Sequence, residues 1–355
     1  MKKKIILPVF LICTIFFACK KSADSPAGNT GYTDIYIVGF EGIGTGPDKA
    51  VYWKNSTKIN LTDGTRNANG YDIFVQGNDV YVAGDEENAS RTIVAKYWKN
   101  GVPVNLTNGV YYASALSIKV IGNDVYVAGA EQTSLAFYAA KYWKNGVPVS
   151  LTNGVREAAA SHIEISGNDV YACGYEYNPT TMGGPIRGIT VAKYWKNGVP
   201  VSLSDGTKDE DACSMAISGN DIYVIGQAKS SLNGHIVAKY WKNGIGFNLT
   251  DTSLSSLTTG IAISGSDVFI SGNLYANGKY QPVYWKNGNR VNLENDNLDN
   301  YASGIAINGN DVIVAGEFGE PYPSNNSTTK YWKNGAATNL TIGNTTAIAF
   351  SVFLK

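Results

Sequence analysis

Few residues in this sequence have the types and spacing that chemistry requires. The chain has two histidines, His162 and His235, and neither belongs to an HExxH zinc motif. A Cys-x-x-Cys pair, an Asp-x-Asp-x-Asp-Gly calcium loop and a Gly-x-Ser-x-Gly nucleophile motif are also absent from the sequence. We interpret both histidines as isolated strand residues. The sequence therefore predicts no catalytic residue, no metal site and no cofactor.

Seven aspartates recur at equivalent positions and could form a ring of carboxylates. Six of them follow a Gly-Asn pair or a close variant of it. An aspartate at such a position bonds the backbone N–H groups of a turn. We therefore predict a structural role for the set, which comprises Asp34, Asp79, Asp124, Asp169, Asp221, Asp267 and Asp311.

These aspartates belong to a repeat of four short strands, which we name A to D. Strand A alternates, as in Ile163-Glu-Ile165, and strand B reads Val-Tyr-Val-Ala-Gly at residues 80–84. Strand C ends in Tyr-Trp-Lys-Asn, and strand D contains a Leu-Thr pair, as at residues 106–107. Alternation with period two is strand geometry. In six of the seven copies a glycine follows Tyr-Trp-Lys-Asn, and the Asn-Gly pair predicts a tight hairpin turn between C and D.

The Tyr-Trp-Lys-Asn motif contains every tryptophan of the chain. A large aromatic residue repeated once per unit buries much area when it packs between neighbouring units. We predict this packing role; a ring of exposed, sugar-stacking tryptophans at a rim is the alternative. The residues are Trp53, Trp98, Trp143, Trp195, Trp241, Trp285 and Trp332.

The two ends of the repeat array predict a closed ring. Successive tryptophans are 44 to 52 residues apart, which is the size of a propeller blade. The array enters at a B strand, residues 34–39, and ends at an A-type strand, residues 345–354, whose apolar positions we assign to Ile348 and Phe350. Together the two pieces make one blade. The sequence thus predicts an all-β, seven-bladed β-propeller with four antiparallel strands per blade, its ring closed by the C-terminal strand completing the first blade.

The repeat resembles two known types of repeat. The order of a turn, a strand ending in glycine and an aromatic strand resembles the kelch repeat of β-propellers. It departs from kelch in having one glycine after strand B and tryptophan in strand C. Tyr-Trp-x-Asn-Gly before a Leu-Thr strand resembles extracellular repeats of the HAF type. The resemblance covers residues 32–355 and implies an architecture, because propellers host many activities.

The N-terminus carries a targeting segment. Lys2 to Lys4 precede an apolar stretch, residues 5–17, that is too short for a comfortable membrane span. The following Ala18-Cys19 resembles the lipobox of bacterial lipoproteins, in the looser form associated with Bacteroidota. This resemblance implies cleavage before Cys19 and lipidation of that cysteine. We expect a signal peptide at 1–18, a lipidated cysteine and flexible tether at 19–31, and the propeller at 32–355, with the protein in the bacterial cell envelope, at the outer membrane, on a side left open.

Two cysteines, Cys173 and Cys213, remain in neighbouring repeats. They could form a disulfide in an oxidising envelope. The favoured interpretation is two small hydrophobic residues in strands.

Candidate binding residues come from the positions where the repeats differ. The loops after strands B and D vary most and lie on the same face of an antiparallel blade; two long B–C loops cover residues 175–190 and 317–329. Tyrosine and arginine are frequent contact residues at recognition surfaces, although solvated loop decoration is the alternative. The candidates are Arg66, Tyr111, Tyr112, Arg156, Tyr177, Arg187 and Tyr301.

Composition narrows the function. Charged residues make up 16% of the chain and the formal net charge is zero, so no nucleic-acid partner is expected. We expect a monomeric, non-enzymatic propeller, held at the membrane by the lipid on Cys19, that binds a glycan or a protein through its loop face. A polysaccharide-active propeller enzyme and a purely structural envelope protein are the alternatives. The enzyme would need acidic residues clustered in the central mouth.

Overall fold

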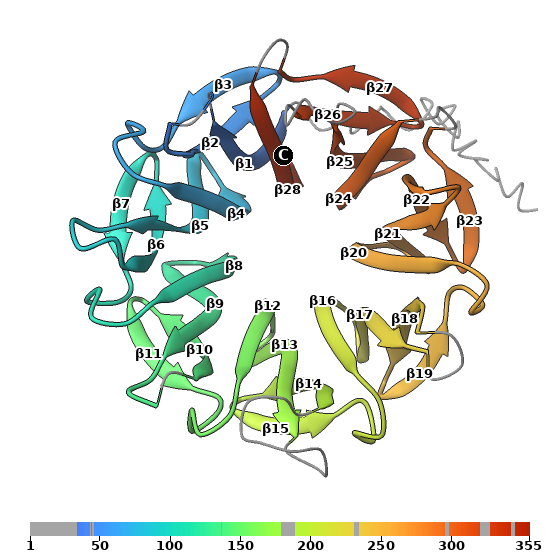
Figure 1. The fold of residues 1–355 in the computed structure, drawn as a ribbon, viewed down its shortest axis with the longest axis horizontal. Helices are drawn as coiled ribbons and strands as arrows, with labels where there is room; N and C mark the ends of the chain where they lie inside the picture. The colour runs from blue at the N-terminus through green and yellow to red at the C-terminus, as the bar shows by residue number, and fades with distance from the viewer. Residues whose placement is uncertain are drawn as a thin grey trace, which may run out of the picture.

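The chain forms a ring of seven blades around a central channel (Figure 1). The computed structural model describes residues 34–42, 44, 46–135, 137–178, 189–230, 234–294, 298–319, 327–341 and 345–355. The regular structure of these residues consists of 28 strands. None of the described residues forms a helix with the length and apolarity to cross a membrane. The predicted signal peptide, Cys19 and tether lie outside the described residues, as does Arg187.

Each blade contains four antiparallel strands in the order A, B, C, D. Blade 1 consists of β28 (Thr346–Leu354), β1 (Ile35–Gly42), β2 (Lys49–Lys54) and β3 (Thr57–Asn60). Blade 2 consists of β4 (Ala68–Gln76), β5 (Asp79–Glu87), β6 (Ile93–Lys99) and β7 (Val102–Asn105). Blade 3 consists of β8 (Ala113–Ile121), β9 (Asp124–Gln132), β10 (Tyr138–Lys144) and β11 (Val147–Ser150). Blade 4 consists of β12 (Ala158–Ser166), β13 (Asp169–Asn178), β14 (Ile189–Lys196) and β15 (Val199–Ser202).

The remaining three blades repeat this arrangement. Blade 5 consists of β16 (Glu210–Ser218), β17 (Asp221–Lys229), β18 (Ile236–Lys242) and β19 (Ile245–Asn248). Blade 6 consists of β20 (Ser255–Ser264), β21 (Asp267–Ala276), β22 (Lys279–Lys286) and β23 (Asn289–Asn292). Blade 7 consists of β24 (Asp299–Asn308), β25 (Asp311–Gly319), β26 (Ser327–Lys333) and β27 (Ala336–Asn339).

The A strands line the channel and the D strands form the rim (Figure 1). Tight turns connect A to B and C to D on one side of the ring, which we call the turn face. The B–C and D–A connections lie on the opposite side, the loop face. The C–D turns need positive φ at two residues, and Asn100 (φ 52°) and Gly101 (φ 81°) show why Asn-Gly recurs there.

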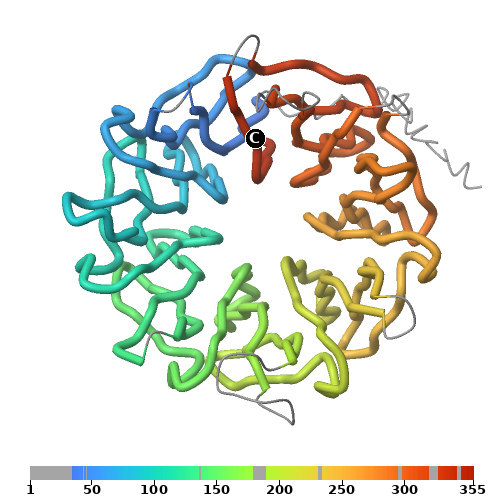
Figure 2. Tube along the Cα trace, viewed as in Figure 1, coloured from blue at the N-terminus to red at the C-terminus, as the bar shows by residue number. Residues whose placement is uncertain are grey.

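The C-terminal strand closes the ring as predicted. β28 pairs with β1 antiparallel, from Ile35 opposite Leu354 to Gly42 opposite Thr346, so the first and last described strands lie side by side (Figure 2). A single parallel bridge from Ser327 to Thr346 joins blades 7 and 1 into one eight-stranded sheet.

The predicted register of the closing strand is wrong. The apolar positions of strand A pair with the first and third residues of the B-strand motif. In blade 4, for example, Ile163 pairs with Ala172, the third residue of that motif. In blade 1 those partners of β1 are Val352 and Leu354, not Ile348 and Phe350. Phe350 instead lines the channel.

This error arises because every A strand contains a β-bulge that the sequence analysis does not predict. In β8 the register shifts between Ala115 and Ser117, and the same shift occurs in each A strand. The bulge brings a carbonyl against the last residue of the B motif. A Cβ at Gly129 would lie 2.0 Å from the Ser114 carbonyl oxygen, so that position requires glycine. The A strands are therefore nine or ten residues long and kinked, not short straight runs.

The tryptophans pack between blades, as predicted. All seven have at most 1% of their surface exposed. Each lies on strand C of one blade and contacts the preceding blade: Trp195 of blade 4 packs against Tyr126, Ala128 and Leu151 of blade 3. Trp53 of blade 1 contacts Ile313 of blade 7, so the same contact closes the ring.

The repeated aspartates have a structural role, but their partners differ from the prediction. In blade 2 the Asp79 carboxylate accepts a hydrogen bond from Asn100 Nδ2 at 2.8 Å and pairs with Lys99 Nζ at 2.9 Å. The backbone N–H of Val80 donates to Asn100 Oδ1 instead. The aspartate thus ties strand B to the C–D turn, and all seven blades repeat the Lys–Asp pair.

Candidate functional site: the channel and its loop-face mouth

The residue after each bulge forms one level of the channel wall, which we call the channel ring. Unlike the aspartates and tryptophans, these seven residues differ from blade to blade. In blade order 1 to 7 they are Ser351, Asp72, Ser117, His162, Ser214, Gly260 and Gly304.

Asp72 is the best-connected member of the channel ring. Its carboxylate accepts hydrogen bonds from Ser117 Oγ (2.9 Å) and Ser351 Oγ (2.8 Å) of the two neighbouring blades. It also accepts from the backbone N–H groups of Ile73 and Ile118, both at 2.9 Å. Asp72 therefore joins the inner strands of blades 1, 2 and 3.

His162 continues this network, so its interpretation as an isolated histidine is wrong. Its Nδ1 lies 3.4 Å from both Ser117 Oγ and Ser214 Oγ, and its Nε2 lies 3.4 Å from Glu164 Oε1. These contacts are longer than the roughly 2.6–3.2 Å at which a base activates a nucleophile. The arrangement therefore supports a polar contact chain across blades 2 to 5.

A half-buried ion pair lies next to His162, on the side toward the turn face. Lys119 Nζ is 2.8 Å from Glu164 Oε1. Burial alone would raise the pKa of Glu164, but the charge of Lys119 and the contact with His162 outweigh burial and lower it. Burial alone would lower the pKa of Lys119, but Glu164 raises it. Each partner thus holds the other in its charged form.

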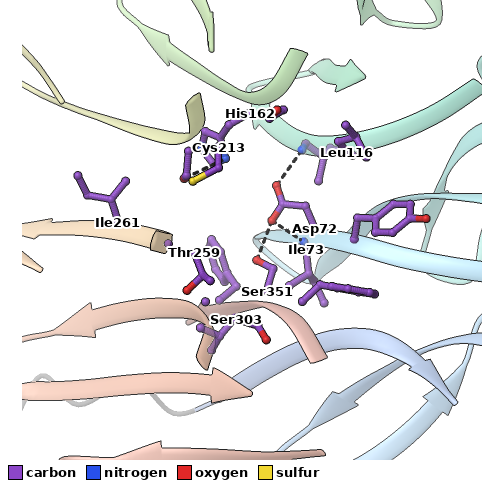
Figure 3. Close-up of a pocket in the computed structure, with 18 of the residues that line it drawn as sticks. Asp72, Ile73, Leu116, His162, Cys213, Thr259, Ile261, Ser303 and Ser351 are labelled. Carbon is purple, nitrogen blue, oxygen red and sulfur yellow. Dashed lines mark hydrogen bonds between the residues drawn. The ribbon is translucent and has the colours of Figure 1, made fainter. Parts of the chain in front are cut away.

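The channel contains a cavity of about 220 Å³ at this level (Figure 3). On the side of blades 1 and 2 its wall is aromatic, with the Tyr71 and Phe350 ring centroids 5.3 Å apart. On the side of blades 6 and 7 the wall carries the hydroxyl groups of Thr259 and Ser303. No group of three or more His, Cys, Asp or Glu side chains placed to hold a metal ion occurs among the described residues.

Three carboxylates, Asp85 buried and Asp211 and Glu317 half-buried, lie on the loop-face side of the channel ring. Asp85 accepts hydrogen bonds from Asn69 Nδ2 (3.2 Å) and Ser114 Oγ (2.6 Å), and burial raises its pKa. Burial also raises the pKa of Asp211 to about 6 and that of Glu317 to about 8. They come from blades 2, 5 and 7 and are separated around the ring.

The sequence-predicted residue Tyr301 lies in an aromatic cluster. It belongs to strand β24 instead of the D–A loop, because the A strands begin earlier than expected. Its ring centroid is 4.9 Å from that of Tyr280, which is 5.0 Å from that of Tyr275. We call these three residues the tyrosine platform; Tyr275 is 42% exposed.

Two further predicted residues, Arg156 and Tyr177, line a common pocket of about 210 Å³ beside blade 4. Tyr177 is not in a loop, since β13 extends to Asn178 and pairs Tyr177 with Thr190. The pocket also contains Lys193, whose ammonium group pairs with the Glu176 carboxylate at 2.5 Å.

The other predicted residues lie elsewhere on the loop face. Arg66 is in the connection between blades 1 and 2, near Asp63. Tyr111 and Tyr112 are in the connection between blades 2 and 3 and are 39% and 43% exposed. Of the six predicted site residues that the structure describes, Arg156 and Tyr177 share a pocket and the other four are dispersed.

The two cysteines are free thiols in the structure. Cys173 is buried and Cys213 is half-buried. Burial raises the pKa of both thiols, that of Cys213 to about 12. They therefore behave as the small strand residues that the sequence favoured.

Comparison with known proteins shows similarity of fold. No protein-family model and no curated protein matches the chain. Among solved structures, a puromycin-hydrolyzing peptidase of Mycobacterium tuberculosis matches with a TM-score of 0.56 and 12% identity, over 85% of this chain and 53% of that one. The propeller domain of the Trilobed protease from Pyrococcus furiosus matches with a TM-score of 0.52 and 10% identity, over 84% and 88%.

An acylaminoacyl peptidase of Pyrococcus horikoshii matches with a TM-score of 0.51 and 10% identity, over 87% of this chain and 50% of that one. This chain therefore spans about half the length of the two peptidases. At such identities the likeness shows a β-propeller fold like that of peptidase propeller domains, and nothing of activity.

Proposed function

We propose that this chain is a non-enzymatic, carbohydrate-binding propeller of the bacterial cell envelope. It is a monomer, anchored in the outer membrane through a lipid on Cys19, and it binds glycans through its loop face. The observation that carries the proposal is the tyrosine platform, Tyr275, Tyr280 and Tyr301. Clustered, partly exposed aromatic rings are suited to the C–H-bearing face of a sugar ring, and tyrosine adds a hydroxyl for polar contact.

The two faces of the ring differ in a way that supports this assignment. The turn face carries the same Lys–Asp pair in every blade, such as Lys286 with Asp267 at 2.8 Å. These charges already have partners and satisfy a need common to all blades. The loop face carries residues that differ between blades, which is where selective binding requires variation.

The position of the tether also supports a binding loop face. Asp34, the first described residue, lies at the start of a B strand and therefore on the turn face. The predicted tether precedes it directly. A lipid anchor attached there leaves the loop face directed away from the membrane.

A glycan array with the full-length chain in detergent tests the proposal. We expect binding to a subset of neutral glycans and a loss of about fivefold or more for Tyr280→Ala, since a ring that stacks on the sugar contributes roughly 1 kcal/mol or more. Lys286→Ala, on the turn face of the same blade, is the matched control and should bind normally. An array without glycan binding, or a Tyr280→Ala variant that binds like the parent, would contradict the proposal, and capture of a protein partner would favour the alternative ligand class.

A further inference from the structure

The wall of the channel cavity has different chemistry on the side of blades 1 and 2 and on the side of blades 6 and 7. Next to the Tyr71 and Phe350 pair, the Phe74 and Phe353 rings lie 5.1 Å apart, one level closer to the turn face. The wall on the side of blades 6 and 7 is polar instead, with the hydroxyl of Ser303 facing the cavity (Figure 3). Ligand sites of proteins combine apolar or aromatic lining with a few polar groups in this way.

Backbone N–H groups add donors to this wall. In strand A, the residue after each channel-ring position lies opposite a B-strand residue whose N–H and C=O groups bond strand C. The two form a non-hydrogen-bonded pair, so the N–H of the A-strand residue points away from strand B and into the channel. Ile118 and Ile163 show this direction, because their N–H groups donate to Asp72 and Ser117 of the preceding blades. In each case a channel-ring side chain of one blade satisfies the N–H of the next.

Two blades lack that side chain. The N–H groups of Ile305 and Val352 are equivalent to those of Ile118 and Ile163, and both residues line the cavity. The preceding channel-ring residues are Gly260 and Gly304, which have no side chain to accept a hydrogen bond. The N–H groups of Ile305 and Val352 therefore face a glycine where those of Ile118 and Ile163 meet an accepting side chain.

Charge selects among the ligands that such donors could bind. Lys119 and Glu164 neutralise each other, and the Asp72 carboxylate adds one further negative charge to the wall. This charge disfavours an anionic ligand in the cavity. The acceptors that the bare N–H groups require must therefore belong to a neutral molecule.

We propose that the channel cavity is a subsite for a single neutral sugar residue, the terminal unit of a glycan held at the loop face. One face of the sugar ring packs against Tyr71 and Phe350, and its oxygens accept from the N–H groups of Ile305 and Val352. A single water fills about 10–15 Å³ of such a cavity, so 220 Å³ has the scale of one sugar ring with its hydroxyl groups. The bulges that line it lie nearer the loop-face ends of the A strands. The subsite rests on the proposed carbohydrate function.

The test uses the full-length chain in detergent and saturation-transfer NMR with free monosaccharides. We expect at least one neutral sugar, from glucose, galactose, mannose and N-acetylglucosamine, to bind, and glucuronate to bind at least tenfold more weakly. Ser303→Phe fills the cavity and should reduce sugar binding at least tenfold. Lys286→Ala, on the turn face and outside the channel, is the matched control and should bind monosaccharides normally.

A second variant distinguishes a loss of sugar binding from a loss of folding. Phe350→Leu keeps an apolar side chain but removes the ring, so it should weaken sugar binding several-fold while the melting temperature stays close to that of the parent. Monosaccharide binding that survives both variants, equal binding of glucuronate, or a channel that holds water only would overturn the subsite. If array glycans still bind in a Tyr280-dependent manner, the proposed function stands without the subsite.

Discussion

Each tryptophan of the repeat is a contact between two blades. Trp195 lies at the centre of a cluster that includes Tyr126 and Leu151 of the preceding blade and Ile163 of its own. A side chain with 1% exposure in such a cluster has no room for a ligand. The alternative of a sugar-stacking tryptophan ring is therefore wrong, and repetition in this chain marks packing.

Trp195→Ala should cost about 3–5 kcal/mol of unfolding free energy, as a large-to-small change in a close-packed core. Urea unfolding followed by circular dichroism measures this loss. Tyr112→Ala, at a 43% exposed position, is the control and should stay within about 0.5 kcal/mol. If the two variants unfold at the same urea concentration, the interblade role of the tryptophan is incorrect.

Glu317 should make stability depend on pH. Burial raises its pKa from 4.5 to about 8, so the folded protein keeps a proton that the unfolded chain has lost between these values. The unfolding free energy therefore falls as the pH rises through this window, by an amount on the order of 4 kcal/mol.

Glu317→Gln should remove most of that dependence. Asp211, with a pKa of about 6, contributes the same trend at lower pH. A comparison between about pH 6.5 and about pH 8.5 therefore isolates Glu317. A parent and variant that lose equal stability over this interval would show that the carboxyl is not buried as described.

At the scale of elements, the bulge separates what the sequence could predict from what it could not. Strand type, blade count, turn chemistry and ring closure follow from alternation and from motifs repeated in seven copies. The bulge breaks the alternation inside strand A, so the sequence predicts Tyr301 in a loop and Phe350 in the core. The channel ring was missed for the same reason. Tyr177 is predicted in a loop because strand B continues past its glycine.

A signal for the bulge is nevertheless present in the sequence. Buried small and branched residues are three apart at this point, as in Ala115 to Ile118 and Ala160 to Ile163, instead of two. The residue before each Ile is Ser117 or His162, so aligning the copies on that spacing would have placed His162 in the channel. The hydrogen bonds between blades could not be predicted, because they depend on how neighbouring A strands approach one another.

Deletion of residues 345–355 should open the ring. It removes β28, leaving β1 without its inner partner and β24 without its neighbour across the blade 7–blade 1 junction. Unpaired strand edges promote association between chains. We expect a lower melting temperature and soluble aggregates in size-exclusion chromatography. Deletion of Lys355 alone leaves β28 intact and is the control, and a monomeric truncation with an unchanged melting temperature would contradict closure by this strand.

At the scale of the whole molecule, the positions of the described chain ends relate the two faces of the ring to the predicted membrane anchor. Both described ends of the chain meet on the turn face, where the Asp34 backbone N–H donates to the Lys355 carbonyl at 3.2 Å. A tether that reaches Asp34 therefore attaches to the face whose charges are already paired, and the variable face remains accessible. The proposed orientation of the two faces requires an anchored N-terminus, so it depends on the predicted lipidation of Cys19.

Cys19→Ser should abolish that anchoring. The positive residues, the apolar stretch and Ala18-Cys19 predict lipid attachment at this thiol, and without it the chain should appear in the soluble fraction or keep its signal peptide. Membrane fractionation combined with metabolic labelling by an alkyne-bearing fatty acid measures both effects. Cys13→Ser is the matched control, because Cys13 lies in the predicted signal peptide and its replacement should change neither labelling nor location. A Cys19→Ser protein that still carries the lipid label and sediments with membranes would show that the anchor lies elsewhere, and the orientation of the two faces inferred from it would then lose its basis.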